Sequence, residues 1–304
     1  MIQLLCTLLL AAPPQNYAPG SDAWNGLEYL KTTAAEAKVS IEMPDELDWT
    51  KVQLRQTLLF VAPGSRIQGK QIVNFVTDGG HVIVALEAGG GAELLRAFGV
   101  KLSPKPVIHD NYYRDHPAFP RLLPSNEHFL WFNVEDIVLN HPTSFQIDPI
   151  ISDNIEAPIR FAEPSQAFAV ELFRGSGNIL FVSDASIFIN DMQRRSYGNK
   201  QLAANLFRYY CSGAECRLTI IPPWAEESGH YLAQGLNTLE GVQNLFGRAV
   251  EELNALSEPT NESLSSKVGS QWLTLGLLLS LFVGALGMLW LENKTMQPWL
   301  QKQQ

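Results

Sequence analysis

The side chains best suited to metal binding or acid–base chemistry gather in one irregular loop. His109-Asp110 and Asp115-His116 form an H-D-x4-D-H cluster there. Imidazole and carboxylate groups together bind Zn²⁺ or Mn²⁺, and they can exchange protons. No helical spacing orients these four side chains toward one another, so we favour the alternative of a polar loop in which Asp and His residues cap turns. We therefore keep the four residues as weak metal candidates and expect no metal and no cofactor.

A second set of candidates follows the ends of predicted buried strands. A Gly-rich turn from Glu87 to Gly91 comes after the apolar segment 82–86, and Ser183-Asp184 follow another apolar segment. Small ligands bind at the carboxyl edge of an open α/β sheet, and a Gly-rich turn before a helix can hold an anion. The alternative for Ser183 or Asp184, and for Asn190, is to cap the next turn. The ligand-binding candidates are Glu87, Gly89, Gly90, Gly91, Ser183 and Asp184.

The same predicted edge includes Pro63-Gly64, which follow a buried segment at 58–61. The loop 109–116 is long enough to fold over this edge. If apolar side chains fill the edge instead, and the loop lies on the opposite side of the sheet, the reason for a ligand site disappears and a protein-binding role is left.

Two cysteines are expected to form a disulfide. Cys211 and Cys216 enclose four residues that include Ser212-Gly213. Apart from Cys6 in the N-terminal apolar segment, no cysteine remains, and such pairing is typical of an oxidising compartment. The alternatives are buried thiols or a metal site, which would need two further soft ligands that the neighbouring sequence does not offer.

The candidates lie between segments that alternate between helix and strand. Helices are predicted from the spacing of apolar residues, and strands from short apolar runs bounded by Gly or Pro. This order predicts an α/β fold with a mostly parallel sheet and helices on both faces. An irregular insertion at 101–165 interrupts it, with one short strand pair near 129–139. The predicted helices cover 21–38, 67–77, 92–98, 200–210 and 235–256, and the strands cover 39–43, 58–61, 82–86, 167–173 and 178–182.

Two apolar segments predict the topology. Residues 1–14 fit a secretory signal, although no Lys or Arg precedes the apolar run, and a buried N-terminal strand is the alternative. Residues 271–291 are uncharged and of spanning length, with Trp near both ends. We place the body on the periplasmic or extracellular side of a bacterial inner membrane. The predicted parts are an α/β extracytoplasmic domain at 15–222, a helical stalk and linker at 223–270, the single span, and a cytoplasmic tail at 292–304.

The charge of the chain excludes one class of partner. Its 304 residues include 22 Lys and Arg against 31 Asp and Glu, a formal net charge of −9. Nucleic-acid binders need a basic surface that releases counterions, so we expect no nucleic-acid binding. The hydrophobic fraction of 46% is that of a folded protein.

Three stretches resemble a known family. They are QGKQIVNFVTDGGHVIVALEAGGGAELLRAFGV (68–100), NYYRDHPAFP (111–120) and GSGNILFVSDASIFINDMQRRSYGNKQLAANLFRYY (175–210). They resemble the family labelled domain of unknown function 4350 over roughly residues 17–210. The first and third are also similar to the extracytoplasmic part of gliding-motility-type ABC transporter auxiliary proteins. The resemblance implies a fold like that of class I glutamine amidotransferases, a flavodoxin-like α/β arrangement, on a membrane-anchored protein. It also implies a MoxR-type AAA ATPase with a von Willebrand-like membrane protein, or an ABC transporter, as partner.

The nucleophile of amidotransferase chemistry is missing from the turn where that fold places it. The fold carries a nucleophilic Cys on a tight turn between a strand and a helix. The matching turn here, 87–91, contains neither Cys nor Ser. We therefore expect a protein that is not an enzyme, namely a sensor or scaffold that binds a protein partner or a small ligand. The alternatives are an auxiliary subunit of an ABC-type exporter and a divergent metal-dependent hydrolase that uses the His/Asp loop.

Overall fold

The computed structural model describes residues 16–64, 67–87, 90–103, 105–107, 109–146, 155–161, 166–211 and 216–231. All of them belong to the compact unit Met1–Gln234. Within these residues, no helix combines the length and the apolar character needed to cross a membrane. The predicted signal-like segment 1–14, Gly89, the helix 235–256, the span 271–291 and the tail 292–304 lie outside the described residues.

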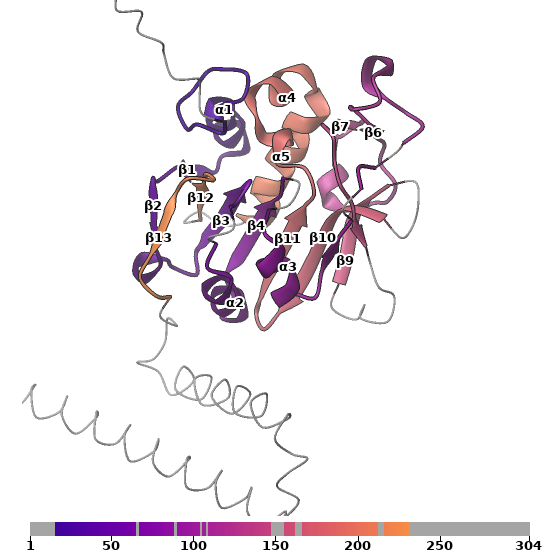
Figure 1. The fold of residues 1–304 in the computed structure, drawn as a ribbon. Coiled ribbons are helices and arrows are strands. Elements are labelled where there is room, and N and C mark those ends of the chain that lie inside the picture. The colour runs from indigo at the N-terminus through magenta and orange to yellow at the C-terminus, as the bar shows by residue number, and fades with distance from the viewer. Residues whose placement is uncertain are drawn as a thin grey trace, which may run out of the picture. The chain divides into compact units, whose positions relative to one another are not determined.

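A nine-stranded sheet forms the centre of the described part of the chain (Figure 1). Its parallel half has the order β1 (Ser40–Glu42), β12 (Arg217–Ile221), β3 (Gln56–Val61), β4 (His81–Ala85) and β11 (Gly177–Val182). Its antiparallel half contains β10 (Gln166–Arg174), which pairs with β11, β9 (Ile155–Arg160) and β8 (Phe145–Gln146), and then β5 (Lys101–Leu102). The predicted mixed α/β class, with a large and mostly parallel sheet, is confirmed.

The parallel strands form because short apolar runs are buried on both of their faces. All residues of β11 are buried, and so is β3 after its first residue. Side chains of β3 alternate between two hydrophobic cores, with Leu59 and Val61 in one and Leu58 and Phe60 in the other. A strand with apolar residues on both faces is typical of a sheet covered on both sides.

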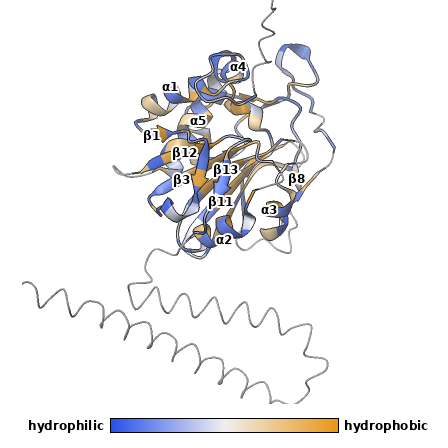
Figure 2. Ribbon diagram, turned by 60° about the vertical axis from the view of Figure 1, so that its left-hand side comes forward, coloured by the Kyte–Doolittle hydropathy of each residue, from blue (hydrophilic) through white to orange (hydrophobic). Residues whose placement is uncertain are grey.

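Helices contribute side chains to both cores. In the core that contains Leu59, α1 (Glu28–Ala37) packs beside α5 (Tyr197–Tyr210), and the short α4 (Asn190–Arg195) contacts both helices. In the other core lie α2 (Gly69–Thr77) and α3 (Ala92–Ala97), which bury Ile72 and Leu94 respectively. Figure 2 shows hydrophobic residues along the central strands and hydrophilic residues on the outer surfaces of the helices. The helices α1, α2, α3 and α5 therefore cover the sheet with their apolar sides, whereas the buried residues of α4 are Asn190 and Gln193.

The first helix begins later than the sequence predicts. It starts at Glu28, whereas the prediction placed its start near Ser21. The side-chain amide of Asn190 donates hydrogen bonds to the backbone oxygens of Ser21 and Ala23, both at 2.7 Å. These oxygens are thus used by a distant segment and not by a first helical turn. Trp24, which lies within the predicted helix 21–38, is 61% exposed. Asn190 therefore holds the N-terminal segment and does not simply cap its own turn.

Strands β10 and β11, predicted at 167–173 and 178–182, form a hairpin around the turn Gly175-Ser176, because Arg174 pairs with Gly177. Gly175 has a φ of +61°, and a Cβ atom there would lie 2.2 Å from the carbonyl oxygen of Thr77 at the end of α2. The backbone nitrogen of Ser176 donates to that same oxygen at 3.2 Å. The turn therefore requires glycine, because its backbone packs directly against the end of α2.

The insertion 101–165 contributes more strands than predicted. Of the short pair predicted near 129–139, one strand is present as β7 (Ile137–Val138), but its partner β6 (Arg121–Leu122) lies earlier in the chain, and 129–131 forms a 3₁₀ helix. In addition, β5, β8 and β9 extend the main sheet beyond β10, because the outer edge of β10 offers backbone groups that need partners. Elsewhere, β2 (Glu46–Asp48) pairs in parallel with β13 (Glu226–Ser228). Short 3₁₀ helices occur at η1 (Trp49–Lys51), η2 (Tyr113–Asp115), η3 (Phe129–Trp131) and η5 (Ala185–Phe188).

Candidate functional site

The ends of β3, β4 and β11 lie side by side at one edge of the sheet. In the parallel register, Val61 and Val182 both pair with Ala85. Beyond the strands, the backbone nitrogen of Leu86 donates to the oxygen of Val182 at 2.8 Å, and that of Ala185 donates to the oxygen of Leu86 at 2.9 Å. The predicted candidates Pro63-Gly64, Glu87, Gly90-Gly91 and Ser183-Asp184 therefore share this edge, whereas Gly89 lies outside the described residues.

Asp184 is buried at this edge, and both of its carboxylate oxygens accept hydrogen bonds. One oxygen accepts from the backbone nitrogen of Ser186 at 2.9 Å and from its hydroxyl at 2.5 Å. The other accepts from the backbone nitrogen of Asn140 at 2.6 Å. Burial raises the pKa of Asp184 to about 7, and the charge of Glu87 acts in the same direction. The side chain caps η5, which is the alternative to ligand binding that its sequence position suggested.

Ser183 fastens the segment 140–143 onto the same edge. Its hydroxyl donates to the backbone oxygen of Thr143 at 2.8 Å, and the Thr143 hydroxyl donates back to the oxygen of Ser183 at 3.4 Å. Ser183 is only 3% exposed. A serine acts as a nucleophile when an adjacent base can take its proton. Here a backbone carbonyl holds that proton, so the arrangement favours a structural role.

The N-terminal segment covers the other side of the edge. Tyr17 is buried in the core that also contains Val61 and Ala85. Its hydroxyl donates a hydrogen bond to the carboxylate of Glu87. Burial, followed by this hydrogen bond, raises the pKa of Tyr17 well above its usual range. Glu87 itself is exposed, while Ser183 is buried with Asp184. Tyr17 was missed because no sequence spacing connects it to a strand end.

The imidazoles of the His/Asp loop cap turns within their own loop. Nδ1 of His109 accepts from the backbone nitrogen of Asn111 at 3.1 Å, and Nδ1 of His116 accepts from that of Ala118 at 3.2 Å. Among the described residues, the metal-ligand types that converge lie elsewhere. They are His128, Glu156 and Glu171, and not His109, Asp110, Asp115 and His116.

The loop 109–116 and α4 line the same cavity. Since α4 follows the carboxyl end of β11 in the chain, the loop lies near this edge of the sheet and not near the opposite edge. A cavity of about 230 Å³ is present between the loop region and α4. The loop contributes Tyr113, Arg114 and His116 to its wall, and α4 contributes Met192 and Arg195.

A larger cavity of about 510 Å³ opens where β3 and β12 end. Glu227 in its wall accepts hydrogen bonds from the indole nitrogen of Trp49 at 2.9 Å and from the backbone nitrogen of Gln68 at 3.2 Å. Burial raises the pKa of Glu227. The sequence prediction did not include β12 and therefore missed this cavity, although an apolar run before Pro222-Pro223 was the available signal. Its lining includes Pro63, Gly64, Ile221, Pro223, Trp224 and Glu227.

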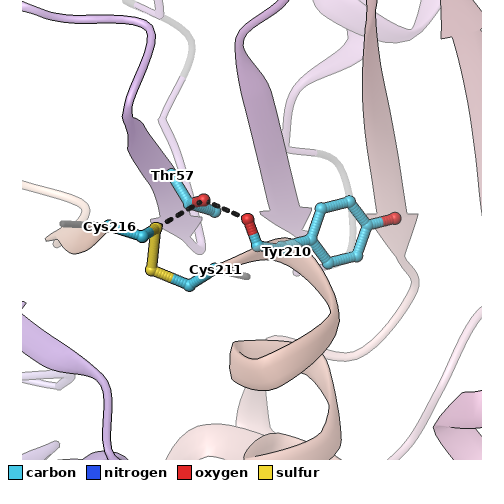
Figure 3. Close-up of a disulfide and its surroundings, with 4 residues drawn as sticks. All are labelled: Thr57, Tyr210, Cys211 and Cys216. Atoms are coloured by element: carbon cyan, nitrogen blue, oxygen red, sulfur yellow. Dashed lines mark hydrogen bonds between the residues drawn. A yellow bond between two sulfur atoms is a disulfide. The ribbon is translucent and has the colours of Figure 1, made fainter. Parts of the chain in front are cut away.

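The predicted disulfide between Cys211 and Cys216 is present (Figure 3). It connects the end of α5 to the start of β12, with the two Cα atoms 5.3 Å apart. Beside it, the hydroxyl of Thr57 donates to the backbone oxygen of Tyr210 at 2.7 Å and lies 3.7 Å from the sulfur of Cys216. These contacts hold the start of β12 against β3.

Comparisons with known proteins support a family assignment and leave function open. A family model described as "Domain of unknown function (DUF4350)" matches residues 19–207. No curated protein sequence matches the chain. Among solved structures, the "mmIFT52 N-terminal domain" is similar at 13% identity with a TM-score of 0.43, over 52% of this chain and 78% of that one. Gan42B, a GH42 beta-galactosidase from "G.", is similar at 12% identity with a TM-score of 0.35, over 64% of this chain and 27% of that one.

Proposed function

The chain belongs to the DUF4350 family, and on that premise we propose that it is a non-catalytic sensor or scaffold anchored in a bacterial inner membrane. Its α/β unit lies on the periplasmic or extracellular side and binds a protein partner or a small ligand. The partner that we propose first is a von Willebrand-like membrane protein working with a MoxR-type ATPase. An ABC-type exporter, of which the chain would be an auxiliary subunit, is the alternative.

The observation that carries this proposal is that the carboxyl ends of β4 and β11 are covered, whereas the cavity lined by Pro63 and Glu227 lies farther along the edge, where β3 and β12 end. An enzyme of this architecture needs reactive groups open to substrate at that edge. Here Tyr17 contacts the turn after β4 through Glu87, and the segment 140–143 is bound to the end of β11 through Ser183 and Asp184. The polar groups of Ser183 and Asp184 are engaged in hydrogen bonds inside the protein. The turn after β4 carries no nucleophile in the sequence.

We further propose a glutamine amidotransferase-like fold that has lost its reaction. In support, the Gly-rich turn between β4 and α3 occupies the strand–turn–helix position at which that fold carries its nucleophile. Glycine is needed at this turn for close packing, because a Cβ atom on Gly90 would lie 2.9 Å from the backbone oxygen of Pro63. Close packing therefore explains the glycine residues of this turn without any catalytic role.

Topology is the first experiment. Protease added to intact spheroplasts should digest the α/β unit and leave the C-terminal tail protected inside. A cytoplasmic protein serves as the control for spheroplast integrity. Protection of residues 20–260 would reverse the orientation and contradict the proposed location.

Partner identity is the second experiment. The full chain, expressed together with the von Willebrand-like membrane protein and the MoxR-type ATPase of the same organism, should co-purify with them from detergent extracts. Purified protein should have no glutaminase activity, and Ser183→Ala should lower thermal stability without changing any turnover. Co-purification with an ABC transporter alone would favour the exporter role, and measurable glutaminase activity abolished by Ser183→Ala would overturn the non-catalytic role.

A further inference from the structure

Three side chains with metal-ligating groups converge in the antiparallel half of the sheet. His128 directly precedes η3, Glu156 lies in β9 and Glu171 lies in β10. One potential ligand atom from each lies within 4.8 Å of the other two. Glu156 and Glu171 are direct cross-strand partners in the pairing of β9 with β10, which Figure 1 shows side by side. Two carboxylates directly opposite each other repel unless a positive charge lies between them.

Glu171 is the strongest reason to expect a cation at this place. It is fully buried, at 0% exposure. One carboxylate oxygen accepts from the side-chain amide of Asn178 at 2.5 Å and from the hydroxyl of Tyr210 at 2.7 Å. The other oxygen is buried and accepts no hydrogen bond of ordinary length from a described residue, although the hydroxyl of Tyr209 also interacts with this carboxylate. A buried carboxylate oxygen without a partner is costly, so it needs either a proton or a cation.

We propose that His128, Glu156 and Glu171 bind one divalent transition-metal ion, with Zn²⁺ as the representative. One imidazole with two carboxylates is a donor set that suits Zn²⁺ and its neighbours in the first transition row. Such ligands bind Zn²⁺ at about 2.0–2.2 Å in a tetrahedral arrangement, so their ligand atoms lie about 3.3–3.6 Å apart. The three ligand atoms lie within 4.8 Å of one another, so they must move closer together by up to about 1.5 Å when the ion binds. Glu156 is exposed and can move by a rotamer change, while Glu171 stays in place.

The surroundings of His128 hold its ring in one orientation. Its ring lies 5.5 Å from the ring of Tyr209, centroid to centroid. Nδ1 accepts from the backbone nitrogen of Leu130 at 3.2 Å. Binding through Nε2 requires the ring proton to move to Nδ1, where it would face the backbone N–H of Leu130, so the ring must also turn away from this donor.

Zn²⁺ binding to the tag-free full chain in detergent, stripped of metal with a chelator, tests the proposal. Isothermal titration calorimetry should give one Zn²⁺ per chain. Glu156→Gln and His128→Gln should each weaken binding at least tenfold, and Zn²⁺ should raise the melting temperature of the wild type but not of these variants. Glu156 is exposed, so its variant should fold. Glu171→Gln has the same shape as the native residue and should also lose binding.

The matched controls are His116→Gln and Asp115→Asn in the loop 109–116, which should bind Zn²⁺ like the wild type. Two results would overturn the proposal. One is the absence of stoichiometric binding, which would mean that a proton on Glu171 meets the need of its open oxygen. The other is binding that survives both Glu156→Gln and His128→Gln, or that is lost in the loop variants, which would place the ion elsewhere.

Discussion

The buried carboxyl of Asp184 should make the stability of the protein depend on pH in a way that Asp184→Asn removes. Burial raises its pKa from 3.8 to about 7 in the folded protein, while the unfolded chain keeps the ordinary value. The folded state therefore binds this proton more tightly than the unfolded state. The contribution of Asp184 to stability is fully present below about pH 4, and it is lost as the pH rises through 7.

The size of this effect follows from the shift in pKa. A rise of about three pKa units corresponds to roughly 4 kcal/mol between the acid and alkaline limits. Of this, roughly 2–3 kcal/mol falls between pH 5 and pH 8, because the folded-state pKa lies in that interval. Asparagine at this position does not titrate, so the free energy of unfolding of Asp184→Asn lacks this pH-dependent contribution. The stability difference between wild type and Asp184→Asn should therefore shrink by roughly 2–3 kcal/mol from pH 5 to pH 8.

Urea unfolding of the full chain in detergent micelles, followed by tryptophan fluorescence at several pH values, measures this difference. Asp115→Asn is the control, because Asp115 is an exposed loop carboxylate. Its unfolding curves should follow the wild type at every pH. A difference between wild type and Asp184→Asn that stays constant, or that grows with pH, would refute the reasoning. Asp184 would then be ionised in the folded protein, and its three hydrogen bonds would outweigh its burial.

Three further tests use the same unfolding measurement at separate places in the fold. Gly175→Ala should destabilise the protein by about 2 kcal/mol or more, because its Cβ atom would collide with the end of α2. Gly99→Ala is the control: at φ +69° with open space around it, it should cost only about 1 kcal/mol. Equal losses would contradict the collision. Replacing Cys211 and Cys216 by Ala should cost about 2 kcal/mol, and reductant should bring the wild type to the same stability; a reductant-insensitive wild type would contradict this. Tyr17→Phe should cost about 1–2 kcal/mol through loss of its hydrogen bond to the turn after β4, and no loss would mean that this bond does not hold the N-terminal segment.

The spacing of apolar and turn residues in the sequence was sufficient to predict the helices and strands that are defined by short continuous segments. The strands β4 and β11, the helices α2 and α3, and the hairpin at Gly175 appear where their periodicity and turn residues place them. The disulfide was predictable for the same reason, since its two cysteines are separated by a short loop. Glu171 also left a local signal that the prediction did not use, because it is a lone charge inside the apolar run of β10.

Tertiary structure alone decided how distant segments meet. The sequence contains no periodicity that places β12 between β1 and β3, or Tyr17 against the turn after β4. Nor does spacing bring His128 and Glu156 to Glu171, since the three come from separate elements. The start of α1 was displaced by Asn190, a residue far along the chain. Local propensities are set by neighbouring residues. These contacts depend instead on which arrangement of the chain buries the most apolar surface and gives every buried polar group a partner. That arrangement is a property of the whole fold.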